Sequence, residues 1–273
     1  MRFVRIVTLV VFILVSAAWG VSSFSFNKNK DDVPPVIEAQ SDHIQITTAS
    51  GEEGLLQGMT ATDNKDGDLS DQILIGKQSK FVKKGTTEVT YLVFDSSNNP
   101  GYYTREVDYV DYHSPEFHLS EPLMFEKNSV VTILDRMRVL DSVQGDISDK
   151  IKIVSSDVDS EEVGIYTMGV EVSNKFGDIV TVQLPINIVE KSNSEVELVL
   201  TNYFKTLNRL EPFDPEQMMP EIRLPNGSMG SPENMTVESN VDPAVPGTYQ
   251  VFYFYEDEQG LTGRTVLTVL VRE

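Results

Sequence analysis

The chain has 273 residues, of which 40% are hydrophobic and 23% are charged, a composition that indicates a folded protein and excludes a disordered or collagen-like chain. Its 42 acidic and 22 basic side chains give a formal net charge of −20, so nucleic acid, itself a polyanion, is not expected as a partner. Cysteine is absent, which excludes disulfides, thiolate metal sites and a cysteine nucleophile.

The first predicted element, residues 1–26, is an export segment. Two arginines precede an apolar run from Ile6 to Val21. Small residues at Ala18 and Gly20 fit a signal-peptidase site, which would release a secreted protein. Alternatively, the stretch up to Phe26 reaches the ~20 residues that span a bilayer, and the helix would stay as a membrane anchor. Both alternatives place the bulk of the chain outside the plasma membrane, at the cell surface if it is tethered.

After a polar linker at 27–33, the helical period gives way to short alternating runs separated by turn residues, which is an all-β pattern. The clearest predicted strand is Glu88–Phe94. The same phrase returns at Gly164–Val172 and at Gly247–Tyr255, about 80 residues apart each time. We therefore expect three units, 34–111, 112–191 and 192–273, joined by short linkers. Each is expected to be a sandwich of two antiparallel sheets with about seven strands.

A second phrase carries a resemblance to a known family. The run TATDNKDGDLSDQI at Thr60–Ile73, introduced by Pro34–Ile37, resembles the bacterial Ig-like repeat of surface proteins and pesticidal crystal-type proteins of Gram-positive bacteria. Residues 139–151 repeat it in part. The third unit, around Val241–Tyr249, is more similar to the group 3 bacterial Ig-like domain and lacks the Asp-Gly-Asp phrase. The resemblance implies three tandem Ig-like β-sandwich domains that serve as spacers or binding units.

The acidic phrase of the first unit suggests a calcium site, but not an EF-hand. With Gly67 at loop position 6, Thr62 falls at position 1 and Ile73 at position 12, where the motif needs acidic ligands. A different oxygen cage remains open, and it would use Asp63, Asp66, Asp68 and Asp95. The competing interpretation is that these side chains cap the backbone of tight turns, with Gly67 at positive φ. No other cofactor is expected.

Strand alternation also predicts a binding surface. If Val89, Tyr91 and Val93 face the core of the first unit, the side chains between and after them face outward. Outward apolar side chains point to a partner surface or to cover by a neighbouring loop or domain. By the same register, these candidate binding residues are Leu92, Phe94, Phe252 and Phe254.

The sequence contains no G-x-S-x-G, H-E-x-x-H, P-loop or G-x-G-x-x-G motif, so we do not expect an enzyme. The leading hypothesis is a monomeric binding or adhesion module that recognises a cell-surface protein or glycan and reaches the membrane only through its N-terminal helix. The alternative is a structural stalk or spacer of the cell envelope without a specific ligand.

Overall fold

The computed structural model describes residues 8, 10–19, 31–191 and 195–273. Residues 10–19 are helical, and no helix among the described residues is long and apolar enough to cross a membrane. Residues 1–7, 9 and 20–26 of the predicted export segment, residues 27–30 of the polar linker, and residues 192–194 of the linker predicted at 191–194 lie outside the described residues.

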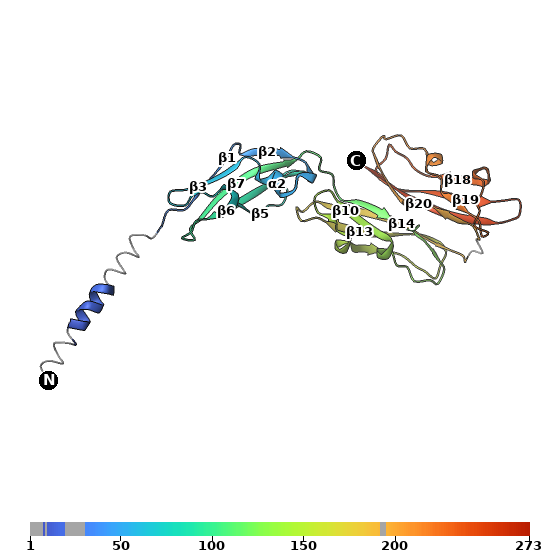
Figure 1. Cartoon of the computed structure of the whole chain (residues 1–273). Helices are drawn as coiled ribbons and strands as arrows, with labels where there is room; N and C mark the ends of the chain where they lie inside the picture. The colour runs from blue at the N-terminus through green and yellow to red at the C-terminus, as the bar shows by residue number, and fades with distance from the viewer. Residues whose placement is uncertain (1–7, 9, 20–30, 192–194) are drawn as a thin grey trace. The chain divides into compact units, whose positions relative to one another are not determined.

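The chain divides into two compact units, Met1–Val110 and Asp111–Glu273 (Figure 1). The first holds one β-sandwich. The second holds two further sandwiches of similar strand order, and the smaller sheet has three strands in the first of them and two in the second. The predicted all-β fold of repeated sandwiches is therefore confirmed.

Unit 1 consists of a three-stranded and a four-stranded sheet. The first has the order β1-β3-β4, with β1 at Val36–Ala39, β3 at Met59–Asp63 and β4 at Gly67–Asp68. The second has the order β2-β7-β6-β5, with β2 at His43–Ile46, β7 at Pro100–Tyr109, β6 at Thr86–Phe94 and β5 at Leu74–Gln78. A short helix, α2 at Gly51–Leu56, and two 3-10 turns, η1 at Thr48–Ser50 and η2 at Ser70–Gln72, complete the unit.

The prediction of purely antiparallel sheets is wrong at one edge of each copy. After a break at Ser41 and Asp42 the chain leaves the first sheet, and β2 pairs in parallel with β7. In the second unit β9 pairs in parallel with β14, and β16 with β20. The reason is that the opening strand of each copy is split between the two sheets, so its second half runs in the same direction as the closing strand.

The core of unit 1 lies between its two sheets and includes Val89, Tyr91 and Val93, all fully buried. Arg105 of β7 is also buried and donates to the main-chain oxygens of Leu55, at 2.6 Å, and of Gln57, at 2.9 Å. Cations are stabilised by the unpaired carbonyls at a helix C-terminus, so this arginine holds α2 against the sheet.

Unit 2 begins with a copy of the same topology. Its smaller sheet has the order β11-β10-β8, with β8 at Glu116–Leu119, β10 at Met137–Asp141 and β11 at Gly145–Asp146. Its larger sheet has the order β12-β13-β14-β9, with β9 at Met124–Glu126, β12 at Lys152–Ser156, β13 at Gly164–Ser173 and β14 at Ile179–Val189. Two 3-10 turns belong to this copy, η3 at Leu134–Arg136 and η4 at Ser148–Lys150.

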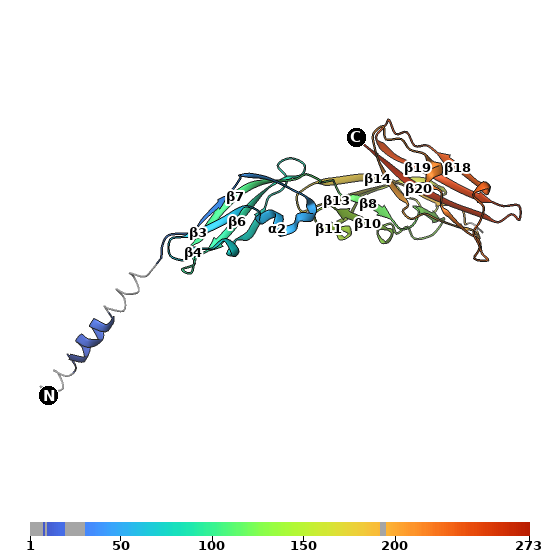
Figure 2. The ribbon, with the colours of Figure 1, turned by 45° about the horizontal axis from the view of Figure 1, so that its top comes forward.

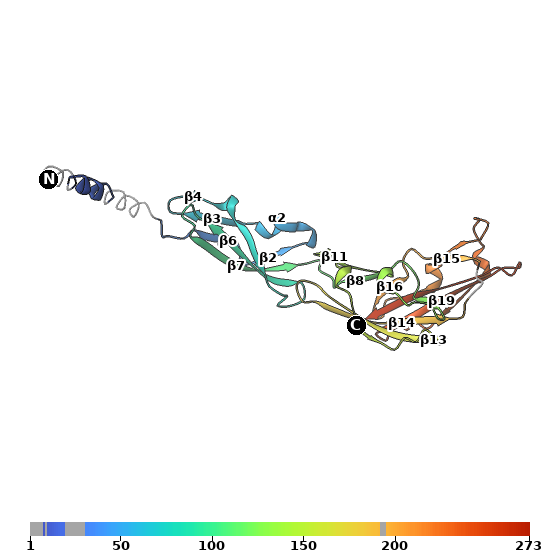
Figure 3. The same cartoon turned by 90° about the horizontal axis from the view of Figure 1, so that it is seen from below.

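The third copy follows in the same unit. Its sheets are β15-β17 and β16-β20-β19-β18, with β15 at Glu197–Val199, β16 at Phe204–Asn208, β17 at Glu221–Arg223, β18 at Met235–Ser239, β19 at Gly247–Glu256 and β20 at Thr262–Arg272. Two 3-10 turns, η5 at Pro215–Met218 and η6 at Pro232–Asn234, lie in its loops. Strands β14 and β19 contact each other (Figure 3). One cluster of buried apolar residues runs through both copies.

Candidate functional site

Strands β3 and β4 lie at the end of unit 1 where the chain enters it (Figure 2). Three carboxylates come together beside the end of β3. Asp31 lies in the segment before β1, Asp63 ends β3 and Asp95 follows β6. One oxygen from each lies within 4.8 Å of the others. Asp31 and Asp95 are 4% and 5% exposed, so two of the three acids are withdrawn from water. We name these three residues the carboxylate cluster.

Turn geometry explains one oxygen of each acid. Asp63 Oδ1 accepts the main-chain N–H groups of Lys65 and Asp66, at 2.8 and 2.9 Å. Asp31 Oδ1 accepts the N–H of Val33 at 3.1 Å. Asp95 Oδ1 likewise accepts two N–H groups from its own loop, at 2.9 and 2.7 Å. These are the bonds by which an aspartate stabilises a tight turn.

The second oxygens are different. Asp31 Oδ2 and Asp63 Oδ2 are buried and have no hydrogen-bond partner. Lys65 Nζ lies 3.6 Å from Asp31 Oδ2, too far for a hydrogen bond, and its side chain is 44% exposed. Only the second oxygen of Asp95 is bonded, to the Asn99 amide at 2.6 Å. A buried charge without a hydrogen bond is unfavourable, so the cluster is incomplete as a structural network.

Asp63 is ionised at neutral pH. The N–H bonds from Asp66 and Lys65 lower the pKa of Asp63 below its ordinary value, against the opposing effect of its burial. The carboxylate therefore keeps its negative charge near the other two acids.

The structure brings together two of the four predicted calcium ligands, Asp63 and Asp95. The other two bond elsewhere. Asp66 Oδ2 accepts the N–H of Ser96 at 2.7 Å, and Asp68 Oδ1 accepts the N–H and the hydroxyl of Ser70, at 2.9 and 2.6 Å.

Sequence reasoning missed Asp31, which lies in the predicted polar linker. The register of the smaller sheet is the feature that could have indicated the place of Asp31. Val36 pairs with Thr62 in antiparallel strands, so the residues just before β1 lie beside those just after β3.

A second acidic group on unit 1 is already balanced by a cation. His43 Nε2 lies 2.9 Å from Asp108 Oδ2 and 3.9 Å from Glu106 Oε1, and Lys83 Nζ lies 3.9 Å from Asp108 Oδ1. Lys83, 66% exposed in its side chain, supplies the positive charge at this surface.

The second copy of the fold carries a different version of the cluster. Asn174 occupies the position after β13 that Asp95 occupies after β6. Its Nδ2 donates to Asp141 Oδ2 and to Tyr112 Oη, both at 2.8 Å. The Tyr112 hydroxyl in turn donates to Asp178 Oδ2 at 2.7 Å. The amide of Asn174 therefore reaches the acid of the neighbouring loop, Asp141. In unit 1 the loop amide is that of Asn99, which donates to Asp95 Oδ2 and to the main-chain oxygen of Asp31 and leaves Asp63 Oδ2 without a donor.

The predicted binding residues lie on the outer face of their strands. In β6, Leu92 is half-buried and Phe94 is 42% exposed. In β19, Phe252 is half-buried and Phe254 is 37% exposed. The two phenylalanine rings of β19 lie nearly parallel, with centroids 6.3 Å apart and an interplanar angle of 14°.

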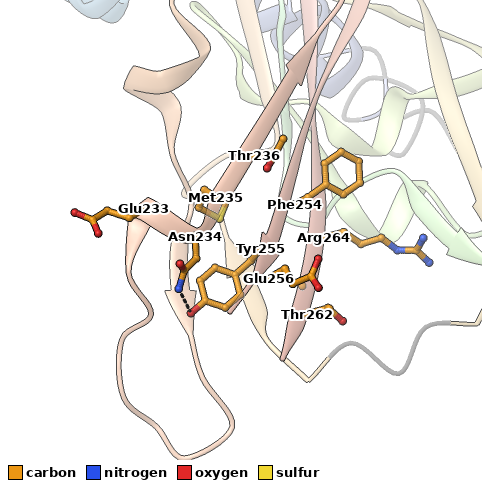
Figure 4. Close-up of a pocket in the computed structure, with 10 residues that line it drawn as sticks. Glu233, Asn234, Met235, Thr236, Phe254, Tyr255, Glu256, Thr262 and Arg264 are labelled. Carbon is orange, nitrogen blue, oxygen red and sulfur yellow. Dashed lines mark hydrogen bonds between the residues drawn. The ribbon is translucent and has the colours of Figure 1, made fainter. Parts of the chain in front are cut away.

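A surface pocket of about 570 Å³ is lined by one member of this pair, Phe254 (Figure 4). Phe254 and Arg264 line it, and they are directly opposite each other on β19 and β20. Two glutamates and three hydroxyl-bearing residues also line the pocket, namely Glu233, Glu256, Thr236, Tyr255 and Thr262. Arg264 Nη2 donates to the main-chain oxygen of Glu190 at 2.8 Å. Sequence reasoning found Phe254 but not Arg264, whose approach to this ring depends on strand register. The pocket combines an apolar ring, a cation and acidic groups, so it can accept a ligand of mixed polarity.

Comparison with known proteins finds weak sequence similarity to a curated protein. No family model matches. The chain is 24% identical over 222 residues to the pesticidal crystal protein Cry22Aa of Bacillus thuringiensis, and the match covers 78% of this chain and 29% of that protein. The chain thus spans less than a third of the length of this relative.

Solved structures give weaker likenesses. Drosophila N-cadherin EC1-3 aligns with 87% of this chain and 99% of its own, at 12% identity and a TM-score of 0.30. The M60 catalytic domain with its CBM51-1 and CBM51-2 domains from Clostridium perfringens ZmpB covers 87% of this chain and 30% of its own, at 13% identity and a TM-score of 0.25. The lipoprotein BT2262 of Bacteroides thetaiotaomicron covers 85% and 98%, at 15% identity and 0.21. At these scores the likenesses support no argument about function.

Proposed function

We propose that this protein is an exported, non-catalytic Ig-like module of the bacterial cell surface, tethered by its N-terminal segment, which binds a partner through the aromatic face of its third repeat. The observation that carries the proposal is the stacked pair Phe252 and Phe254 beside the pocket with Arg264. The weak identity to Cry22Aa supports assigning the repeats to bacterial Ig-like modules.

The partner we propose is a cell-surface protein or glycan. Two partly exposed phenylalanine rings cost the unbound protein little stability. Covering them with a partner surface removes apolar area from water, which favours binding. Arg264, Glu233 and Glu256 would supply directional contacts around the rings. Since the chain carries a formal net charge of −20, a neutral or basic partner surface fits better than an acidic one.

The test is attachment of the full-length protein to isolated cell envelopes. Phe254→Ser removes the more exposed ring and is expected to reduce attachment at least tenfold, which corresponds to about 1.4 kcal/mol. Ile165→Ser removes an apolar side chain that is 65% exposed on β13 and serves as the matched control. Equal attachment by Phe254→Ser and native protein, with unchanged melting temperatures, would contradict the proposal.

A structural spacer is the second candidate, and the packing within unit 2 favours it. The N–H of Tyr203 donates to the main-chain oxygen of Leu119 at 3.0 Å, and Arg272 donates to that of Pro115 at 3.1 Å. These bonds tie the second copy to the third, as a rigid spacer requires. A spacer predicts that Phe254→Ser and Ile165→Ser attach alike, whereas the binding module predicts a loss for the first alone.

Export and tethering are tested by fractionating producing cells and identifying the N-terminal peptide by mass spectrometry. An intact N-terminus in the membrane fraction is the expected result. A mature start near Val21 in the medium would contradict tethering, and protein confined to the cytosol would contradict export. The non-catalytic assignment fails if the purified protein turns over glycoside or ester substrates.

A further inference from the structure

We infer that Asp31, Asp63 and Asp95 form a calcium site that fixes the segment before β1 to the loops that follow β3 and β6. The proposal concerns unit 1 alone and does not depend on the aromatic face of the third repeat.

The first argument is the pair of orphaned oxygens. Asp31 is 4% exposed. The Oδ2 atoms of Asp31 and Asp63 are both buried, and neither has a hydrogen-bond partner. Lys65 contributes one charge at 3.6 Å from Asp31, against three acidic side chains. A divalent cation would satisfy both oxygens at once and offset the repulsion that remains.

The second argument is spacing. Calcium binds oxygens at 2.3–2.6 Å, so two oxygens on opposite sides of one ion lie about 4.6–5.2 Å apart. The three carboxylate oxygens of the cluster lie within 4.8 Å of one another. One ion can therefore contact all three without a change of fold, and water would fill the remaining positions of a coordination shell of about six to eight.

The third argument is the internal comparison with the second repeat. There Asn174 replaces the aspartate and donates hydrogen bonds to Asp141 and Tyr112, so each polar group has a protein partner. In unit 1 the amide of the same loop belongs to Asn99, which donates to Asp95 Oδ2 and to the main-chain oxygen of Asp31, so Asp31 Oδ2 and Asp63 Oδ2 stay without a donor. The difference is explained if a cation does in unit 1 what the amide does in unit 2.

Calcium is favoured over magnesium by the irregularity of this site. Magnesium requires near-octahedral geometry at 2.0–2.1 Å and retains most of its water, whereas calcium accepts irregular carboxylate shells. The three acids come from three separate segments whose positions are set by turn hydrogen bonds, an arrangement that suits the more tolerant ion.

The experiment is calorimetric titration of the full-length protein, purified in detergent with chelator, against calcium chloride and then magnesium chloride. We expect one calcium site with a Kd of about 10⁻⁴ to 10⁻³ M, the range of extracellular modules. Calcium at 100 times the Kd should raise the melting temperature of unit 1 by roughly 10 °C relative to chelator. No heat of binding and no shift would overturn the proposal, and an equal effect of magnesium would overturn the choice of calcium.

Variants distinguish a metal ligand from a residue that only supports a turn. Asp95→Asn and Asp31→Asn keep the Oδ1 acceptor that their loops use but remove a ligand charge, so calcium binding should fall at least tenfold. Asp68→Asn makes the same change of charge outside the cluster and should bind calcium as the native protein does.

The sign of the effect in chelator is a second readout. Asp31→Asn removes one of three repelling carboxylates without breaking a bond to Oδ2, so it should leave the melting temperature of the metal-free protein equal or higher. Asp95→Asn also loses the bond from the Asn99 amide, so only its calcium affinity is compared. If Asp31→Asn melts lower in chelator and both variants bind calcium with the native affinity, the acids are structural and the proposal is wrong.

Discussion

The substitution Asn174→Asp in the second repeat tests whether its amide replaces a cation. The change swaps Nδ2 for an oxygen, so the bonds to Asp141 Oδ2 and Tyr112 Oη, both 2.8 Å in the native protein, lose their donor. It also places a second carboxylate at hydrogen-bond distance from Asp141. Asn174 is 6% exposed, so water cannot easily supply the missing donor.

The expected cost follows from those two bonds. A hydrogen bond to a charged acceptor contributes about 1.5–3 kcal/mol and one to a neutral hydroxyl about 1 kcal/mol. We therefore expect Asn174→Asp to lower the free energy of unfolding of unit 2 by about 3 kcal/mol at neutral pH, before any repulsion is counted.

The loss should depend on pH. The nearby carboxylate raises the pKa of the carboxyl introduced at position 174 in the folded state above its unfolded value, because like charges disfavour ionisation. The folded protein then binds a proton that the unfolded chain releases, so stability falls as pH rises above about 4. As pH falls toward that value the folded protein binds the proton, which restores a donor toward Asp141, so most of the cost should already have disappeared at pH 4.5.

Scanning calorimetry at pH 4.5 and pH 7.5 in chelator measures the difference from native protein at each pH. A cost of about 3 kcal/mol corresponds to a fall of roughly 6–12 °C in the melting temperature of a unit of this size. Asn128→Asp adds the same charge at an exposed turn and should change neither value appreciably. The same decrease at both pH values would refute the argument that the amide relieves carboxylate repulsion.

Three further outcomes are expected. Arg105→Met should destabilise unit 1 by about 3 kcal/mol in urea unfolding, because Leu55 and Gln57 lose charged donors inside the protein; a loss below about 1 kcal/mol would show that water replaces the guanidinium. Gly101→Ala should destabilise the same unit by about 1–3 kcal/mol, since a Cβ would lie 2.2 Å from the Pro35 oxygen, and an unchanged melting temperature would mean that the β1 segment moves freely. Acid should lower the stability of the protein below about pH 4. Hydrogen bonds from Ser70 hold the pKa of Asp68 below its ordinary value, so the ionised Asp68 carboxylate stabilises the fold above that pH. This contribution is lost as pH falls and the carboxylate is protonated. Asp68→Asn should therefore make the acid transition of unit 1 shallower.

Much of the fold could be predicted because period-two alternation is a local signal. In β6, Val89, Tyr91 and Val93 face the core as their spacing indicates. The break at Ser41 and Asp42 was also visible in the sequence, but it does not state which strand the second half will join, so the parallel pair of β2 with β7 was missed.

The candidate site was only half predictable for a related reason. Asp63 and Asp95 belong to phrases that repeat along the chain, and repetition drew attention to them. Asp31 belongs to no phrase. Its place in the cluster depends on the antiparallel register of β1 with β3, which is long-range information. In the opposite sense, Asp66 and Asp68 share the acidic phrase but use their oxygens to bond local N–H and hydroxyl groups.

The loop after the central strand shows how one backbone supports different chemistry. The Oδ1 atoms of Asp95, Asn174 and Asp257 each accept two main-chain N–H groups of their own loop. This bond requires only a side-chain carbonyl or carboxylate oxygen, so the fold explains why aspartate or asparagine recurs at this position. The fold leaves the second atom of the side chain unconstrained. In the second repeat that atom is a nitrogen that donates to Asp141. In unit 1 it is an oxygen that accepts from the Asn99 amide and lies close to two further acids, and a cation there can satisfy the unpartnered oxygens of those two acids.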